Sequence, residues 1–149
     1  MIERVELYHG VAFARLCRGS SGRSVELRQH GEIRSAYIVG ERIGMYVKYS
    51  TNRLSPWPFS FRRDHQEEIH QLHDECEDAF VTLVCGTDGI VCLGWEEYCW
   101  ALDSDIGAVE WIKASRRPRE KYTLTGSDSH SSFKVGDNEY PSKIFAALG

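Results

Sequence analysis

The sequence lacks paired cysteine motifs, and this excludes two common classes of small protein. Its 149 residues hold five cysteines, none spaced as Cys-x-x-Cys: Cys17, Cys76, Cys85, Cys92 and Cys99. An odd number of scattered cysteines argues against a disulfide framework and against a four-thiolate zinc site. We therefore expect mostly reduced core thiols in a cytoplasmic protein.

Long apolar runs and a basic excess are also missing. The longest apolar run, residues 79–85, is interrupted by Thr82 and is far shorter than the roughly 20 residues that span a bilayer. The first residues, Met1-Ile2-Glu3-Arg4, show no basic flank followed by an apolar core. We therefore expect no membrane partner and no secretory signal. A formal net charge of −4 argues against a globally basic nucleic-acid-binding protein, although a local patch can still bind phosphates.

What the chain does contain is enough apolar sequence for one buried core. Its residues are 42% hydrophobic and 27% charged, which is typical of a single globular domain. Periodicity and turn residues predict the following elements: a helix over 2–16, strands over 25–28, 36–39 and 43–49, a helix from Asp64 that buries Ile69, Leu72 and Cys76, strands over 80–85 and 90–93, a short helix over 95–102 ended by Asp103-Ser104-Asp105, and a hairpin over 109–114 and 121–125. This order, α-β-β-β-α-β-β-α-β-β, predicts an α+β domain. We expect a mostly antiparallel sheet centred near residues 80–85, with helices on at least one face.

Two local patterns refine this prediction. Two prolines in Ser55-Pro56-Trp57-Pro58 forbid a helix and disfavour a central strand. We expect an extended segment here that presses Trp57, Phe59 and Phe61 onto one surface. Asp64, followed three residues later by Glu67, predicts an aspartate capping box at the start of the second helix.

The strand predicted over residues 43–49 has one apolar face and one more polar face. The first face holds Ile43, Met45 and Val47, and the second holds Gly44, Tyr46, Lys48 and Ser50. Lys48 is therefore expected to project from the more polar face. It is either a chemically active group or the ordinary polar residue of a half-buried strand.

The order helix, three strands, helix, strand over residues 2–85 resembles the common core of the PD-(D/E)xK nuclease superfamily. In that family the third strand carries an acid two positions before a lysine, and a second acid enters from the preceding strand. The acids hold Mg²⁺ and the lysine orients or activates the attacking water. Here Lys48 stands where the family lysine would stand, but Tyr46 occupies the position of the acid.

The resemblance implies one of two states for this chain. An acid has migrated, with Glu41 or Glu32 approaching from a turn and Mg²⁺ or Mn²⁺ as the cofactor, or the domain has kept the fold and lost the chemistry. His9 lies in the apolar stripe of the first helix, where an imidazole needs a hydrogen-bond partner or a cavity. Lys48, Glu41 and His9 are therefore the candidate catalytic residues, with a satisfied core histidine as the other interpretation of His9.

A possible metal site on the second helix is disfavoured. His70, His73 and Asp74 are one turn apart and together could hold a metal. The expected buried stripe, however, leaves His70 and Asp74 toward water, and the spacing is not His-Glu-x-x-His. We expect a solvated face and no metal.

One basic cluster stands out near the end of the chain. Five cations fall within nine residues, opposed by Glu120 alone: Lys113, Arg116, Arg117, Arg119 and Lys121. Trp111 precedes this predicted hairpin turn and Tyr122 follows it, so the cluster could hold phosphates and stacked bases, or it is a solvated turn. It favours a nucleic acid or another acidic partner. The sequence thus predicts a small nucleic-acid-associated domain of nuclease-like layout, and the alternative is a non-enzymatic protein-interaction or accessory module.

Overall fold

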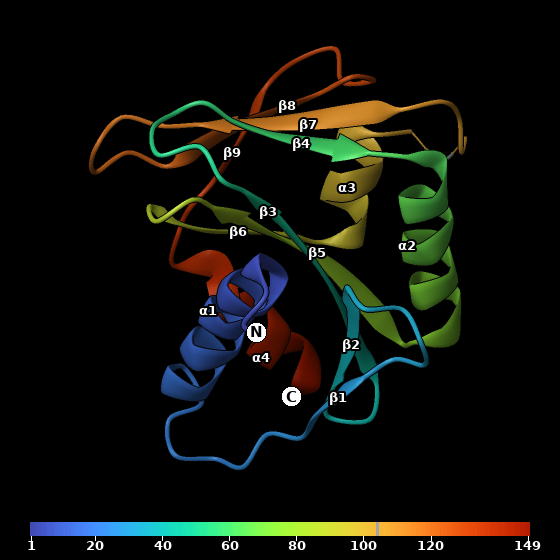
Figure 1. Cartoon of the computed structure of the whole chain (residues 1–149), viewed down its shortest axis with the longest axis vertical. Helices are drawn as coiled ribbons and strands as arrows, with labels where there is room; N and C mark the ends of the chain where they lie inside the picture. Colours follow the sequence, from blue (N-terminus) through green and yellow to red (C-terminus); the bar gives the residue numbers. More distant parts are fainter. Residues whose placement is uncertain (104) are drawn as a thin grey trace.

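The computed structural model describes residues 1–103 and 105–149, and within them four helices and nine strands. In chain order they are α1 (Arg4–Arg18), β1 (Leu27–Gln29), β2 (Ala36–Val39), β3 (Ile43–Ser50), β4 (Trp57–Phe61), α2 (Arg63–Glu75), β5 (Asp78–Cys85), β6 (Gly89–Leu93), α3 (Trp95–Ala101), β7 (Glu110–Ser115), β8 (Tyr122–Gly126), β9 (Phe133–Val135) and α4 (Glu139–Leu148). They form a single α+β domain, as the sequence predicts (Figure 1). Ser104, which we placed in the segment that ends the short helix, lies outside the described residues.

The described strands form two sheets, whereas the sequence pattern predicts one. The five-stranded sheet has the order β1-β2-β3-β5-β6, and the four-stranded sheet has the order β4-β7-β8-β9. β5 is buried along both faces, as expected, but β3 occupies the centre of its sheet and β5 lies beside it. β3 is central because it pairs with β2 along one edge and with β5 along the other. Its face that carries Tyr46 is covered by the second sheet and by α2.

The connections between strands determine where the second helix lies. β1, β2 and β3 form the predicted antiparallel meander. β5 then pairs parallel with β3 along its whole length, from Ile43 opposite Asp78 to Ser50 opposite Cys85. Parallel neighbours need a crossover connection, and the chain makes it through β4 and α2. This crossover brings the first turn of α2 next to the second half of β3.

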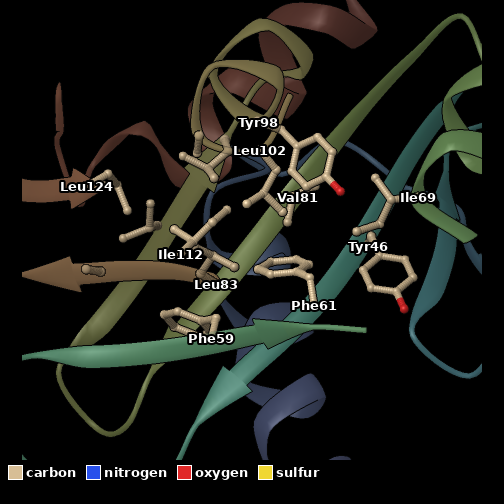
Figure 2. Packing of buried hydrophobic residues seen from close by; sticks show 14 of the residues in the cluster. Tyr46, Phe59, Phe61, Ile69, Val81, Leu83, Tyr98, Leu102, Ile112 and Leu124 are labelled. Carbon is tan, nitrogen blue, oxygen red and sulfur yellow. The ribbon is translucent and has the colours of Figure 1, made fainter. Parts of the chain in front are cut away.

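The larger core lies between the two sheets. Trp57, Phe59 and Phe61 of β4 are all buried and alternate with exposed Pro58 and Ser60, as predicted. β4 is an edge strand, where the missing N–H of Pro58 does no harm. Figure 2 shows side chains from β4, β7 and β8 directed at Val81 and Leu83 of β5.

A second core covers the opposite face of the five-stranded sheet. There α1 and α4 pack through Ala12, Leu16 and Ile144 against β3, β5 and β6 (Figure 1). Cys85 lies in the core between the two sheets, and Cys92 lies in the second core. Burial raises the pKa of the Cys92 thiol to about 12, which makes it unreactive at neutral pH.

The start of α2 differs from the expected aspartate capping box. The helix begins at Arg63, and the backbone N–H of Arg62 donates to Nδ1 of His65 at 3.3 Å. Asp64 forms an ion pair with Arg62 at 3.1 Å instead of capping the helix. The imidazole of His65, at the third helical position, therefore accepts the capping hydrogen bond that we assigned to Glu67.

Candidate functional site

Lys48 lies at the meeting point of β3, β4 and α2. The sequence suggested that it projects from a polar face, but Tyr46 on the same face is 1% exposed and Lys48 itself is half-buried. Its Nζ lies 3.0 Å from Nδ1 of His65 and 5.0 Å from the centre of the Phe61 ring. Lys48 is therefore a cation enclosed by an imidazole and an aromatic ring.

The charge of Lys48 is poorly compensated. Burial and, after it, the neighbouring Arg62 guanidinium lower the pKa of Lys48 to about 8, although Asp64 and Glu68 act in the opposite direction. No carboxylate within residues 1–103 and 105–149 forms an ion pair with it. At neutral pH the amine is still mostly protonated, so the fold holds a half-buried cation without an anionic partner.

His65 is a neutral imidazole in this arrangement. Burial, then Lys48 and Arg62, lowers its pKa below the ordinary value. Its Nδ1 faces two donors, Lys48 Nζ and the Arg62 N–H, so Nδ1 is the acceptor and Nε2 carries the proton. The ring thus offers one further N–H donor next to the lysine.

A cleft of about 620 Å³ opens beside Lys48. Its walls come from the first half of α1, the segment before β2, the end of β3 and the start of α2. Three cationic side chains line it, those of Arg4, Arg34 and Lys48, and one carboxylate, that of Glu3. Glu3 pairs with Arg34 at 3.2 Å. The cleft therefore has an excess of cations, in a chain whose net charge is −4.

The structure brings one of the other two candidate catalytic residues to this cleft. His9 lines it, is 4% exposed and shares a hydrogen bond of 2.7 Å between its Nδ1 and the hydroxyl of Tyr37. Burial, and then Arg34, lowers the pKa of His9 to about 4, so it is neutral at pH 7. This geometry matches the satisfied core histidine that we considered.

Glu41 is not near the cleft. It is exposed in the turn between β2 and β3, seven residues before Lys48 along an extended strand. Seven residues of strand span about 23 Å. The structure therefore does not support a grouping of Glu41 with Lys48.

The residues around Lys48 do not fit a divalent metal. The hydroxyl of Tyr46 donates to Oε1 of Glu68 at 2.7 Å, so the carboxylate nearest to the position of the family acid is engaged by a phenol. Mg²⁺ requires several oxygen ligands in near-octahedral geometry. The described part of the chain contains no cluster of three His, Cys, Asp or Glu side chains suited to a metal. Neither His65 nor Glu68 was identified from the sequence, since each reaches β3 only through the crossover.

The histidines further along α2 are also packed differently from our expectation. The ring of His73 stacks on Trp95 of α3 at 3.7 Å, and the edge of His70 approaches the same indole at 5.1 Å. Asp74 does face solvent. His70 is only partly solvated, because Trp95 of α3 contacts its ring.

One of the five cations of the basic hairpin, Arg116, is bound within the fold. The side chain of Arg116 is 13% exposed, bonds to Asp88 at 2.7 Å and to Asp137 at 3.1 Å, and lies 4.3 Å from the centre of the Tyr122 ring. Tyr122 is itself buried and cannot stack on a base. Four cations stay exposed: Lys113, Arg117, Arg119 and Lys121. Trp111 is also exposed.

Comparison with protein-family models, with curated proteins and with solved structures finds no match for this chain. Within residues 1–103 and 105–149, none of the helices combines the length and apolar character needed to cross a bilayer.

Proposed function

We propose that this chain is a nucleic-acid-associated domain that holds a backbone phosphate in the cleft beside Lys48. The observation that carries the proposal is the half-buried ammonium of Lys48, whose one hydrogen-bond partner in the described structure is a neutral histidine. A half-buried cation is unfavourable unless an anion compensates it. A bound phosphate supplies that anion.

The donors around the cleft suit a phosphate group. Lys48 offers ammonium hydrogens, His65 offers the N–H of Nε2, and Arg4 offers a guanidinium group from the cleft wall. Arg34 also lines the cleft, and its guanidinium has N–H donors beyond the Nη2 that binds Glu3. Hydrogen bonds between charged donors and phosphate oxygens are among the stronger ones in proteins.

Cations at both ends of one strand favour a polyanion over a single phosphate. Lys48 lies against Phe61 at the end of β4. Arg117, Arg119 and Lys121 follow β7, which pairs with β4 from Phe61 to Trp57. The five residues of β4 span about 16 Å. A nucleic-acid strand carries regularly spaced phosphates over that distance, and a mononucleotide does not.

The nuclease-like layout is part of the proposal, and metal-dependent cleavage is not. The order α1, β1, β2, β3, α2, β5 supports the layout, with β4 inserted before α2. The tyrosine at the position of the family acid and the unsuitable ligand set favour binding without cleavage. Incubation of purified protein with DNA and RNA in Mg²⁺ or Mn²⁺ checks this, since degradation that is lost in Lys48→Ala would restore the catalytic interpretation.

The binding proposal is tested by fluorescence anisotropy with labelled 20-nucleotide DNA and RNA. We expect Lys48→Met to weaken binding about tenfold and to reduce the slope of log affinity against log salt by about one, because one phosphate contact is lost. Lys134→Met is the matched control, since Lys134 is an exposed lysine on β9 away from the cleft.

Equal binding by the wild type and Lys48→Met would contradict the proposal. Unlabelled pyrophosphate serves as a competitor. If pyrophosphate bound in a Lys48-dependent way and neither DNA nor RNA bound, the cleft would be a site for a small phosphate ligand and the nucleic-acid assignment would be wrong.

A further inference from the structure

A second, apolar groove of about 440 Å³ lies along α1 and shares Arg4 with the lining of the Lys48 cleft. It runs between α1 and the hairpin that joins β5 to β6, and Leu7, Tyr8, Val11 and Ile90 supply much of its apolar lining. Tyr8 stacks on Tyr49 at 4.6 Å, and Tyr49 lines the Lys48 cleft. This pair of rings therefore stands between the phosphate cleft and the apolar groove.

Two apolar side chains on the α1 wall of the groove are exposed to solvent. Leu7 is 60% exposed and Val11 is 42% exposed. Neither residue belongs to the two cores of the protein. The outer face of an amphipathic helix normally carries polar residues, so this stripe is unfavourable unless something covers it.

Two arginines mark the ends of the stripe. Arg4 and Arg15 both line the groove and are eleven residues apart, which is three helical turns and about 16 Å on one face of α1. Neither forms an ion pair with a carboxylate in the described part of the chain. The groove thus has an apolar centre and a cation at each end.

We propose that this groove docks an amphipathic helix of a partner protein, with apolar residues at its centre and acidic residues about 16 Å apart. Helices commonly bind grooves through apolar residues one turn apart, and the acidic residues complement Arg4 and Arg15. Arg4 lines both this groove and the Lys48 cleft, whereas Leu7, Val11 and Arg15 line the groove and not the cleft. The apolar stripe therefore distinguishes peptide docking from phosphate binding at Lys48.

Two other occupants fit the groove less well. A second copy bound through the same face would place arginine against arginine, whichever way the two helices run, and like charges repel. A lipid surface is disfavoured because the apolar residues line a recess between α1 and the β5–β6 hairpin, which a flat bilayer does not enter.

Selection from a displayed library of random 16-residue peptides on the wild-type chain tests the proposal. Counter-selection uses the double variant Leu7→Ser, Val11→Ser, which removes the exposed stripe without touching either core. We expect the enriched peptides to be helical, with a Leu-rich, Ile-rich or Phe-rich centre between two acidic positions. Anisotropy of a labelled selected peptide should show at least tenfold weaker binding to the double variant and to Arg4→Glu with Arg15→Glu.

The matched control is Arg28→Glu, because Arg28 is an exposed arginine on the opposite side of β1 from Leu27, which packs in the α1–α4 core. It should bind the selected peptide as the wild type does. Lys48→Met should do the same, which separates this site from the phosphate cleft. The circular dichroism spectrum and thermal midpoint of the double variant verify its fold.

Three outcomes would overturn the proposal. They are enriched peptides without acidic residues, equal binding of a selected peptide to the double variant, and no enrichment at all. Sedimentation of the wild type with vesicles of phosphatidylserine and phosphatidylcholine tests the lipid surface, and self-association that is lost in the double variant tests the second copy. Either result, in place of peptide binding, would also reject the docked helix.

Discussion

Lys48 and Arg116 are two half-enclosed cations that differ in their partners. Each lies over an aromatic ring, Lys48 at 5.0 Å from the centre of Phe61 and Arg116 at 4.3 Å from that of Tyr122. Arg116 bonds to two carboxylates, which raise its pKa although burial lowers it. Lys48 has no carboxylate partner among the described residues, and its pKa falls to about 8. Arg116 is therefore engaged within the fold and stabilises it, whereas Lys48 is available to a ligand.

The largest effect should come from the paired cation. We expect Arg116→Ala to lower the free energy of unfolding by about 2–3 kcal/mol, because it leaves the Asp88 carboxylate without its cation next to the buried Tyr122. Urea denaturation measures this, and Arg117→Ala, an exposed neighbour, should change stability by less than about 0.5 kcal/mol. Equal stabilities of the two variants would show that Arg116 does not stabilise the fold through its ion pairs.

The next effect concerns His9, which lines the cleft beside Lys48. Its pKa is lowered to about 4, so between pH 6.5 and 4 the unfolded chain takes up a proton that the folded chain resists. Stability should therefore fall as pH falls through this window, by on the order of 2 kcal/mol from this residue. His9→Gln should flatten that part of the pH profile of the urea midpoint, and an unchanged profile would mean that another group causes the fall.

Lys48→Met should act on stability with the opposite sign to Arg116→Ala. Because the folded pKa of about 8 lies below the ordinary value, the charged amine is disfavoured in the folded state at pH 7. Its removal should leave stability unchanged or raise it by up to about 1 kcal/mol. The wild type should also gain stability as pH rises from about 8 toward 10.5, and the variant should lack this gain. A loss above about 1 kcal/mol in the variant would show that Lys48 is a structural residue.

The smallest effect concerns the exposed hairpin cations. Arg117→Ala with Arg119→Ala should weaken oligonucleotide binding only a few-fold at about 0.1 M salt and reduce the salt slope by less than two, since such exposed contacts are screened. Anisotropy at several salt concentrations measures this. An unchanged slope would show that these hairpin cations contact solvent and not phosphates. The Lys48 cleft would then be the phosphate site.

Local signals in the sequence predicted most of the strands and helices. Alternation and glycine turns predicted the meander of β1, β2 and β3, and the Asp88-Gly89 turn predicted the β5–β6 hairpin. The division into two sheets was not predictable in the same way. The alternating rings at Trp57, Phe59 and Phe61 require a buried surface but do not specify which one.

The site depended on contacts between distant segments, which one sequence does not reveal. His65 is 17 residues from Lys48, and Glu68 is 22 residues from Tyr46. Arg116 finds Asp88 and Asp137 at separations of 28 and 21 residues. The five cations of the hairpin therefore looked equivalent, although one of them is bound within the fold. Lys48 was identified by its place on the strand, and its environment came from the crossover through α2.

An NMR titration shows whether Lys48 is an unpaired cation that binds a phosphate. The ¹³Cε and ¹⁵Nζ shifts of Lys48, assigned with Lys48→Met, report the pKa of its amine with and without a saturating unlabelled oligonucleotide. We predict a pKa near 8 in the free protein and a rise of one unit or more in the complex, because a bound phosphate stabilises the charged form. A pKa near 10.5 in the free protein that the oligonucleotide leaves unchanged would show that Lys48 is neither an uncompensated cation nor a phosphate ligand.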